Sequence, residues 1–347
     1  MKIAVYAICK DEPIVHINRF MTSAKGADIV VLADTGSSPT SLKDLDSAKY
    51  YGVQTNIHHI SINPWRFDTA RNVALALVPA DVDVCVRLDL DEVLEPGWRQ
   101  AIEEAWAGPV TQLWYDFTHS PGYTVRANNI HARHGYIWRG WDHEGLYAAT
   151  GCPSVLGQSK VSITHHQDHS KPRTSIRARL ELAVQEDKSS RTRYYLGREY
   201  FYYNFSERCI ATLMDYLKLP DATWAAERMD AMSMIAESYF RMSQIGQGIS
   251  WYYKAIAECT TREPYLGLAR HLYRLNNKEQ ALGLAQAAIR LTNKLTNIYH
   301  KPSAWDKTPY VFIARCARDL GLESLAQKYD ALGESLFPTI NLAKQAA

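Results

Sequence analysis

The sequence predicts an α/β domain with a mostly parallel sheet in residues 1–188, followed by an all-α domain of helical repeats in residues 189–347. In the first part, short apolar runs alternate with stretches of helical periodicity, which is the pattern of successive β-α-β units. In the second part, strand patterns vanish and small residues recur at a nearly constant spacing. Stacked helix pairs have that signature.

Composition and charge place the chain among ordinary globular proteins. Of its 347 residues, 46% are hydrophobic and 22% are charged, which is enough for a large core. The formal net charge of +2 does not by itself indicate a nucleic-acid partner. The six dispersed cysteines form no C-x-x-C pair, which favours reduced thiols and a cytoplasmic protein. No stretch reaches the roughly 18 apolar residues of a membrane span.

Three apolar runs predict the first buried strands, at 3–8, 29–33 and 53–60. Lys10, Asp11 and Glu12 follow the first strand, and a polar loop with Asp34 and Gly36 follows the second. Because the carboxyl ends of parallel strands meet at one edge, both clusters are expected where ligands bind. The loop's residues alone favour a turn over a nucleotide pocket, in which Asp34 would accept hydrogen bonds.

A further buried strand is expected at 84–88, and it leads directly into Asp89, Asp91 and Glu92. Three carboxylates so close together repel one another, and a divalent cation with oxygen ligands would neutralise them. Acidic triplets are also common where a strand enters a loop. This segment alone therefore leaves a metal site and a polar turn equally open.

A helix is expected after residues 63–67, with Asp68 or Thr69 as its N-cap. Arg71 would then lie in the first turn of this helix, close to the strand ends. From that position its side chain could contact a diphosphate, or pair with Asp34 or Asp89.

Taken in order, the segments Val31-Leu32-Ala33-Asp34-Thr35-Gly36-Ser37, Phe67-Asp68-Thr69-Ala70-Arg71-Asn72 and Leu88-Asp89-Leu90-Asp91-Glu92 carry a family resemblance. Their order and spacing resemble the family 2 nucleotide-sugar glycosyltransferases of the GT-A fold, which is Rossmann-like. The resemblance covers roughly residues 1–100. One departure is that many relatives carry a second acid after the Gly-Ser, where this chain has Ser38 and Pro39.

The resemblance implies a role for each matching residue. Asp34 would contact the nucleobase of a UDP- or GDP-linked sugar, with Lys10, Glu12 and the Gly36 loop nearby, and Arg71 would contact the diphosphate. Asp91 would bind Mn²⁺ or Mg²⁺ directly, while Asp89 would reach the ribose or the metal. Such an ion would neutralise the departing diphosphate.

The middle of the chain predicts a strand at 110–117 and a pair of strands within 123–138, joined around Asn128 and Asn129. Residues 136–145 then combine aromatic side chains with a histidine and two acids. That composition fits a carbohydrate or base-stacking pocket as well as an aromatic core patch.

A His-Glu pair after an aromatic strand is similar to the acceptor-side motif of this glycosyltransferase branch. The resemblance thus implies Glu144 as the general base, with His143 beside it as orienter or alternate base. Asp142 is the reserve candidate.

A strand at 160–164 is followed by His165, His166 and His169. No cysteine accompanies them, which argues against a closed zinc site. By analogy with some GT-A enzymes, His165 or His166 would be a further ligand of the metal held at Asp91, with local hydrogen bonding as the alternative.

Four basic residues come next. Lys171 and Arg173 are expected to close over the diphosphate. Arg177 and Arg179, on the following helix, are more typical of a solvated basic face.

In the C-terminal half, Gly197, Ala236 and Ala269 are separated by 39 and 33 positions, close to the 34-residue period of tetratricopeptide repeats. Small residues also recur in the next helix of each unit, at Gly248, Ala281 and Ala326. Helix pairs of this kind leave a concave surface, so this half is expected to bind a partner or form a homo-oligomer. The insertion 295–305 interrupts the last spacing and is a candidate contact loop.

The leading functional hypothesis is a metal-dependent, inverting glycosyltransferase that uses a nucleotide-sugar donor and a hydroxyl or thiol acceptor. A protein or peptide side chain, a glycan and a hydroxymethylated base of DNA are all admissible acceptors. The rival hypothesis is a non-catalytic repeat scaffold built on a decayed transferase fold. The joint retention of these site residues argues against decay: Asp34, Asp89, Asp91, Glu92, His143 and Glu144.

Overall fold

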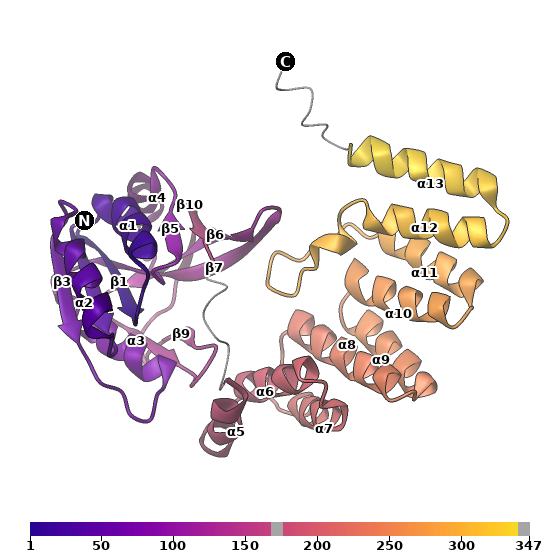
Figure 1. Ribbon diagram of the computed structural model, residues 1–347, viewed down its shortest axis with the longest axis horizontal. Coiled ribbons are helices and arrows are strands. Elements are labelled where there is room, and N and C mark those ends of the chain that lie inside the picture. The colour runs from indigo at the N-terminus through magenta and orange to yellow at the C-terminus, as the bar shows by residue number, and fades with distance from the viewer. Residues whose placement is uncertain (168–175, 339–347) are drawn as a thin grey trace. The chain divides into compact units, whose positions relative to one another are not determined.

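The computed structural model describes residues 1–167 and 176–338, and the chain divides into two compact units, Met1–Asp187 and Lys188–Ala347 (Figure 1). Unit 1 is a mixed α/β unit built on one large sheet, and the described part of unit 2 contains helices and no strand. The predicted combination of an α/β part and a helical part is confirmed. Among the described residues, no helix is both long and apolar enough to cross a membrane.

The large sheet of unit 1 has the strand order β3-β2-β1-β4-β7-β6-β10-β5. Strands β3, β2, β1 and β4 run parallel, and β7 is antiparallel to both β4 and β6. Strand β10 is parallel to β6 and antiparallel to β5. The strands are β1 (Ile3–Cys9), β2 (Ile29–Asp34), β3 (Thr55–His59), β4 (Val84–Arg87), β5 (Glu92–Leu94), β6 (Gln112–Ser120), β7 (Tyr123–Ala132) and β10 (Leu156–His165).

The strand order reverses at β1, because the chain runs outward from β1 to β2 and β3 and then returns to β4 on the other side of β1. In open sheets of this kind, ligands bind outside the carboxyl ends of the strands at such a reversal. A separate two-stranded sheet pairs β8 (Tyr136–Arg139) with β9 (Gly145–Ala148).

Helices cover both faces of the large sheet, which explains why β1 is buried along its whole length and is apolar throughout. On one face Phe20 and Trp98 pack into the core, and on the other Ala70, Ala74 and Trp138 do so. The helices of unit 1 are α1 (Ile14–Ser23), α2 (Pro39–Asp46), α3 (Phe67–Ala76), α4 (Trp98–Ala105) and α5 (Ile176–Glu186), with short 3-10 helices at Ala24–Gly26 and Ser47–Tyr50.

One predicted turn is wrong. Asn128 and Asn129 lie inside β7, and the chain turns only before β8, where Gly135 has a φ of 83°. The β6–β7 register shifts between Ala127 and Ile130, so the two asparagines occupy an irregularity within β7, and the ladders on either side of it keep the strand continuous.

Unit 2 consists of four antiparallel helix pairs in the part that the structure describes. The pairs are α6 (Ser190–Tyr202) with α7 (Ser206–Tyr216), α8 (Ala225–Arg241) with α9 (Ile245–Glu258), α10 (Arg262–Arg274) with α11 (Lys278–Ile289), and α12 (Thr308–Asp319) with α13 (Glu323–Leu336). The predicted small residues lie where two helices meet. A Cβ added at Gly197 would overlap Leu213 of α7, and one added at Gly248 would lie 2.7 Å from the Phe240 ring of α8. The predicted helical repeat is confirmed by these pairs.

The insertion between α11 and α12 folds back onto the repeats and contains a short 3-10 helix, Pro302–Ala304. Tyr299 donates a hydrogen bond of 2.6 Å to Glu227 of α8, and Trp305 donates one of 2.8 Å to Glu263 of α10. Both carboxylates are buried and also accept hydrogen bonds from Tyr216 and Thr261, so the insertion supplies each buried acid with a further donor. Within this segment Tyr299, His300 and Ala304 are buried, whereas Thr296, Ile298 and residues 301–303 are exposed.

Replacing Gly197 by alanine should lower the free energy of unfolding by about 1–3 kcal/mol, because the added methyl group must displace buried Leu213. The matched control is Gly283→Ala, at an exposed site within α11 where a Cβ meets nothing within 4 Å. That variant should gain about 0.5–1 kcal/mol from helix propensity. Urea unfolding of the full chain, followed by circular dichroism, measures both. Equal effects of the two variants would contradict the close packing of α6 on α7.

Candidate active site

A cavity of about 840 Å³ lies at the carboxyl ends of β1 and β4, where the strand order reverses. This volume lies within the usual range of small-molecule sites, roughly 300–1,000 Å³. The residues that line it belong to strand ends and the loops after them, to the first turns of α3, and to α5. They are Ile8, Cys9, Lys10, Asp11, Glu12, Thr35, Ile62, Trp65, Phe67, Arg71, Asp89, Leu90, Asp91, His165 and Arg179.

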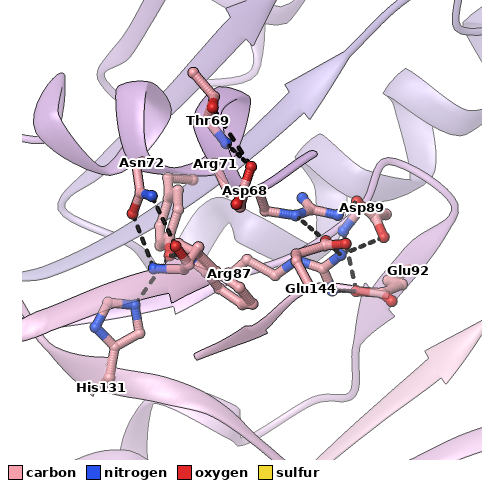
Figure 2. Close-up of polar contacts among 11 residues, drawn as sticks. Asp68, Thr69, Arg71, Asn72, Arg87, Asp89, Glu92, His131 and Glu144 are labelled. Carbon is pink, nitrogen blue, oxygen red and sulfur yellow. Dashed lines mark hydrogen bonds and ion pairs between the residues drawn. The ribbon is translucent and has the colours of Figure 1, made fainter. Parts of the chain in front are cut away.

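An ion-pair network forms one side of this site (Figure 2). Arg71 of α3 donates from Nη2 to Asp89 and from Nε to Glu144, both at 2.7 Å. Arg87, the last residue of β4, donates to the other oxygen of Asp89 at 2.6 Å. Its second amino group lies 3.6 Å from Glu92. Both arginines are buried.

This network supplies positive charge to the acidic cluster from the protein itself. Asp89 is already held by two guanidinium groups. Burial alone would raise the pKa of Asp89, but the positive charges of Arg71 and Arg87 outweigh burial and hold that pKa below its usual range. Glu92 begins β5 and accepts a hydrogen bond from the backbone N–H of Asp89, and burial is the main cause that raises the pKa of Glu92 to about 7.

Asp91 has a different partner. Its carboxylate lies 3.2 Å from Nε2 of His165, and both side chains are about one-fifth exposed and line the cavity. His166 meets Asp91 only through its backbone N–H, which donates to the Asp91 carbonyl at 2.7 Å. The hydrogen bond to Asp91 raises the pKa of His165 above its ordinary value. The remaining predicted members of this region, His169, Lys171 and Arg173, lie outside the described residues.

The Asp91–His165 pair suits a hard divalent ion in its donor chemistry. Carboxylate oxygen and imidazole nitrogen are accepted ligands of Mn²⁺, and substrate phosphates and water commonly complete the coordination of such ions. In the part of the chain that the structure describes, no group of three or more histidine, cysteine or acidic side chains is arranged to hold a metal.

The Asp34 loop is a tight turn at the end of β2. Asp34 accepts hydrogen bonds from the backbone and hydroxyl of Ser37, at 3.1 and 2.5 Å, and lies 3.1 Å from Nδ1 of His59. Burial would raise the pKa of Asp34, but these hydrogen bonds lower it below its usual value. Gly36 has a φ of 108°, which glycine adopts without strain. Lys10 and Glu12 line the cavity.

Helix α3 holds the β8–β9 connection, which contains the candidate base Glu144. Asn72 exchanges two hydrogen bonds of 2.9 Å with the backbone of Trp138 in β8. Asp68 accepts a hydrogen bond from the backbone N–H of Gly140 and pairs with Arg66. The prediction of Asp68 or Thr69 as the N-cap is wrong, since the helix begins at Phe67 and Asp68 bridges to the β8–β9 connection instead.

The three predicted base candidates occupy different surroundings. Glu144 is held through Oε1 by Arg71, and no hydrogen bond to its Oε2 occurs among the described residues. Asp142 is buried and forms a two-pronged ion pair with Arg179, at 2.7 and 2.8 Å, and burial raises its pKa. His143 is half-buried with a φ of 56°, an unusual value for a residue with a side chain.

Arg179 overturns the expectation of a solvated basic face. It pairs with Asp142 and lines the cavity, because α5 packs within unit 1. Trp65 and Phe67, whose rings meet edge-on at 5.2 Å, also line the cavity and are not predicted as site residues. The sequence feature that could have identified them is their position in the segment Asn-Pro-Trp-Arg-Phe, where an expected helix begins.

A buried polar chain anchors β8 beneath this site. Trp138 Nε1 donates to the Tyr6 hydroxyl at 2.8 Å, and that hydroxyl lies 3.0 Å from Nε2 of His131. Nδ1 of His131 lies 2.8 Å from the carbonyl oxygen of Ala132. A neutral ring that donates from Nδ1 satisfies every one of these contacts. Burial lowers the pKa of His131 to about 4, which agrees with a neutral ring.

No protein-family model matches the chain, and no curated protein matches it. Solved structures similar to part of it include MamA, with 20% identity, a TM-score of 0.36 and coverage of 44% of this chain and 81% of that one. PilF of Pseudomonas aeruginosa has 14% identity, a TM-score of 0.36 and coverage of 46% and 67%. The C-terminal part of a TPR repeat-containing protein from Cytophaga hutchinsonii has 14% identity, a TM-score of 0.38 and coverage of 47% and 60%.

The buried His131 predicts a pH dependence of stability. Its pKa falls from 6.5 in the unfolded chain to about 4 in the folded one, so the unfolded state binds more protons in this window and stability is lost as pH falls. Between pH 7 and pH 5 this residue should remove about 2 kcal/mol from the free energy of unfolding. Urea unfolding at both pH values, with His131→Gln as the comparison, isolates the effect. An equal loss in both proteins would refute the assignment.

Proposed function

We propose that unit 1 is a metal-dependent, inverting glycosyltransferase of the GT-A type, which takes a sugar from a UDP- or GDP-linked donor. The observation that carries the proposal is a cavity at the switch point of a largely parallel sheet, with Asp91, His165 and Arg71 on its wall. The three segments that resemble family 2 glycosyltransferases all end at this edge, after β2, at the start of α3 and after β4.

The wall residues suit a nucleotide sugar. Arg71 has a buried Nη1 without a hydrogen-bond partner, so it retains a donor for an anionic ligand such as a diphosphate. Lys10 adds a second cation at the cavity wall, and Trp65 adds an aromatic surface. A Mn²⁺ or Mg²⁺ ion held by Asp91 and His165 would supply positive charge to the leaving diphosphate.

In an inverting transfer, the acceptor oxygen attacks the anomeric carbon of the sugar while the bond to the diphosphate breaks and its electron pair leaves with the diphosphate. The proton of the acceptor hydroxyl needs a base. Glu144 is the preferred base, since Arg71 fixes Oε1 and leaves Oε2 to accept the proton. The ion pair with Arg71 also orients the Glu144 carboxylate.

The helical repeats of unit 2 are assigned to partner binding or self-association, because stacked pairs present a continuous surface. These repeats also support a second candidate function. In it the protein is a non-catalytic scaffold, and unit 1 has lost its catalytic activity.

Nucleotide binding is the first test. With UDP or GDP at 100 times its Kd and Mn²⁺ present, the native protein should gain about 2.7 kcal/mol, measured as a rise in Tm. Asp91→Asn should lose the metal-dependent part of this rise, and EDTA should do the same to the native protein. The control Asp46→Asn alters an exposed carboxylate paired with Lys49 and should behave as the native protein does. No shift with either nucleotide would favour the scaffold.

Glu144→Gln tests the base. It should lower kcat about 100- to 10,000-fold while nucleotide binding persists, because Gln keeps the shape and cannot take a proton. Mass spectrometry of products from a panel of donors and acceptors measures transfer, and Tm reports the loss of the ion pair. Asp142→Asn and His143→Ala serve as comparisons. A larger loss of kcat in either of them would move the base to that residue.

A further inference from the structure

A cluster of rings adjoins the candidate metal pair, on the hairpin of β6 and β7. His119 meets Phe117 edge-on at 4.7 Å and stacks on Tyr123 at 5.2 Å with the planes 22° apart. Phe117 and His119 each lie 6.0 Å from the ring of His165. All four rings are half-buried. Phe117, His119 and Tyr123 are termed the ring platform below.

The strand register explains why these rings meet. Phe117 and His119 are two residues apart on β6 and therefore point to the same face of the sheet. Phe117 pairs with Ile163 of the parallel strand β10, so His165 comes beside His119 two residues further along. His165 lines the cavity, and the ring platform lies next to His165 on the neighbouring strand, through the contacts of Phe117 and His119 with its ring.

The chemistry of the hairpin selects a class of ligand. Residues 117–125, Phe-Thr-His-Ser-Pro-Gly-Tyr-Thr-Val, include no lysine, arginine, aspartate or glutamate. Recognition of a nucleic-acid backbone depends on cations, which this segment does not supply. It offers instead half-buried rings beside hydroxyl groups, with Thr118 and Thr124 in contact at 2.9 Å.

We propose that the ring platform binds the acceptor and that the acceptor is a carbohydrate. The C–H face of a pyranose ring packs against Tyr123 and His119, and the sugar hydroxyl groups form hydrogen bonds with polar atoms near these two rings. Tyrosine and histidine suit this role because each side chain combines an apolar ring surface with a polar atom. The role of the saccharide as an acceptor rests on the proposed glycosyltransferase function. The binding of a saccharide at the ring platform can be measured without a donor.

The test uses the full chain with methyl glycosides of glucose, galactose and N-acetylglucosamine as probes. Saturation-transfer NMR measures their binding without donor or metal, and mass spectrometry measures transfer from a panel of UDP- and GDP-sugars. At least one glycoside should bind and accept a sugar. Tyr123→Ala should raise the KM for that glycoside at least tenfold while the donor KM changes less than twofold, and Tyr123→Phe should restore most of the loss. Tyr50→Ala, at an 87% exposed tyrosine of unit 1, is the matched control and should equal the native protein.

The outcomes separate this inference from the proposed function. If nucleotides with Mn²⁺ stabilise the protein but only a peptide or a duplex with hydroxymethylated cytosine accepts the sugar, the carbohydrate inference is overturned and the glycosyltransferase stands. If no nucleotide binds, the glycosyltransferase falls. In that case a glycoside whose NMR signal is lost in Tyr123→Ala still supports a saccharide site at the ring platform, and the absence of any signal overturns it.

Discussion

Two buried arginines determine how the acidic edge of the sheet is built. Removing a guanidinium group from water costs several kcal/mol, and only well-placed carboxylates offset that cost. Arg71 and Arg87 meet this requirement together, by sharing Asp89 and reaching Glu144 and Glu92. The network closes only where α3, the end of β4 and the β8–β9 connection meet. Three segments far apart in the chain are thus fixed to one another at the mouth of the cavity.

The same ion pairs give Asp89 and Asp91 different roles. Asp89 is neutralised by protein, so it is a structural anchor whatever else it contacts. Asp91, only two residues later, faces His165 and the cavity, and it is the acid that we propose as a metal ligand. Helix α3 adds a second anchor through Asn72 and Asp68, which hold the β8–β9 connection by its backbone. The position of Glu144 therefore depends on one helix that supplies an ion pair and backbone hydrogen bonds together.

Unit 2 obtains its stability by close helix approach and by buried carboxylates with aromatic partners. Gly197 and Gly248 allow helices of a pair to touch, and the insertion before α12 brings Tyr299 and Trp305 to buried acids of α8 and α10. A segment that interrupts a repeat spacing is commonly read as a loop for partners. Here Tyr299 and Trp305 of this segment complete the interior of the unit, and Thr296, Ile298 and residues 301–303 remain exposed.

Periodicity and composition alone determined the two architectures, because a fully apolar strand such as Ile3–Cys9 and a recurring small residue such as Gly197 are local signals of burial and of helix contact. They also placed Asp91 and Arg71 near one edge, since parallel strand ends must converge, whereas the resemblance to GT-A enzymes suggested His165 as their neighbour. What only the tertiary structure decided is pairing. It gave Asp89 two arginines, gave Asp142 the side chain of Arg179, and placed Asn128 at a register shift within a continuous strand. Such partners come from distant segments, and the free energy of a buried charge or of a completed ladder depends on them and outweighs any local preference.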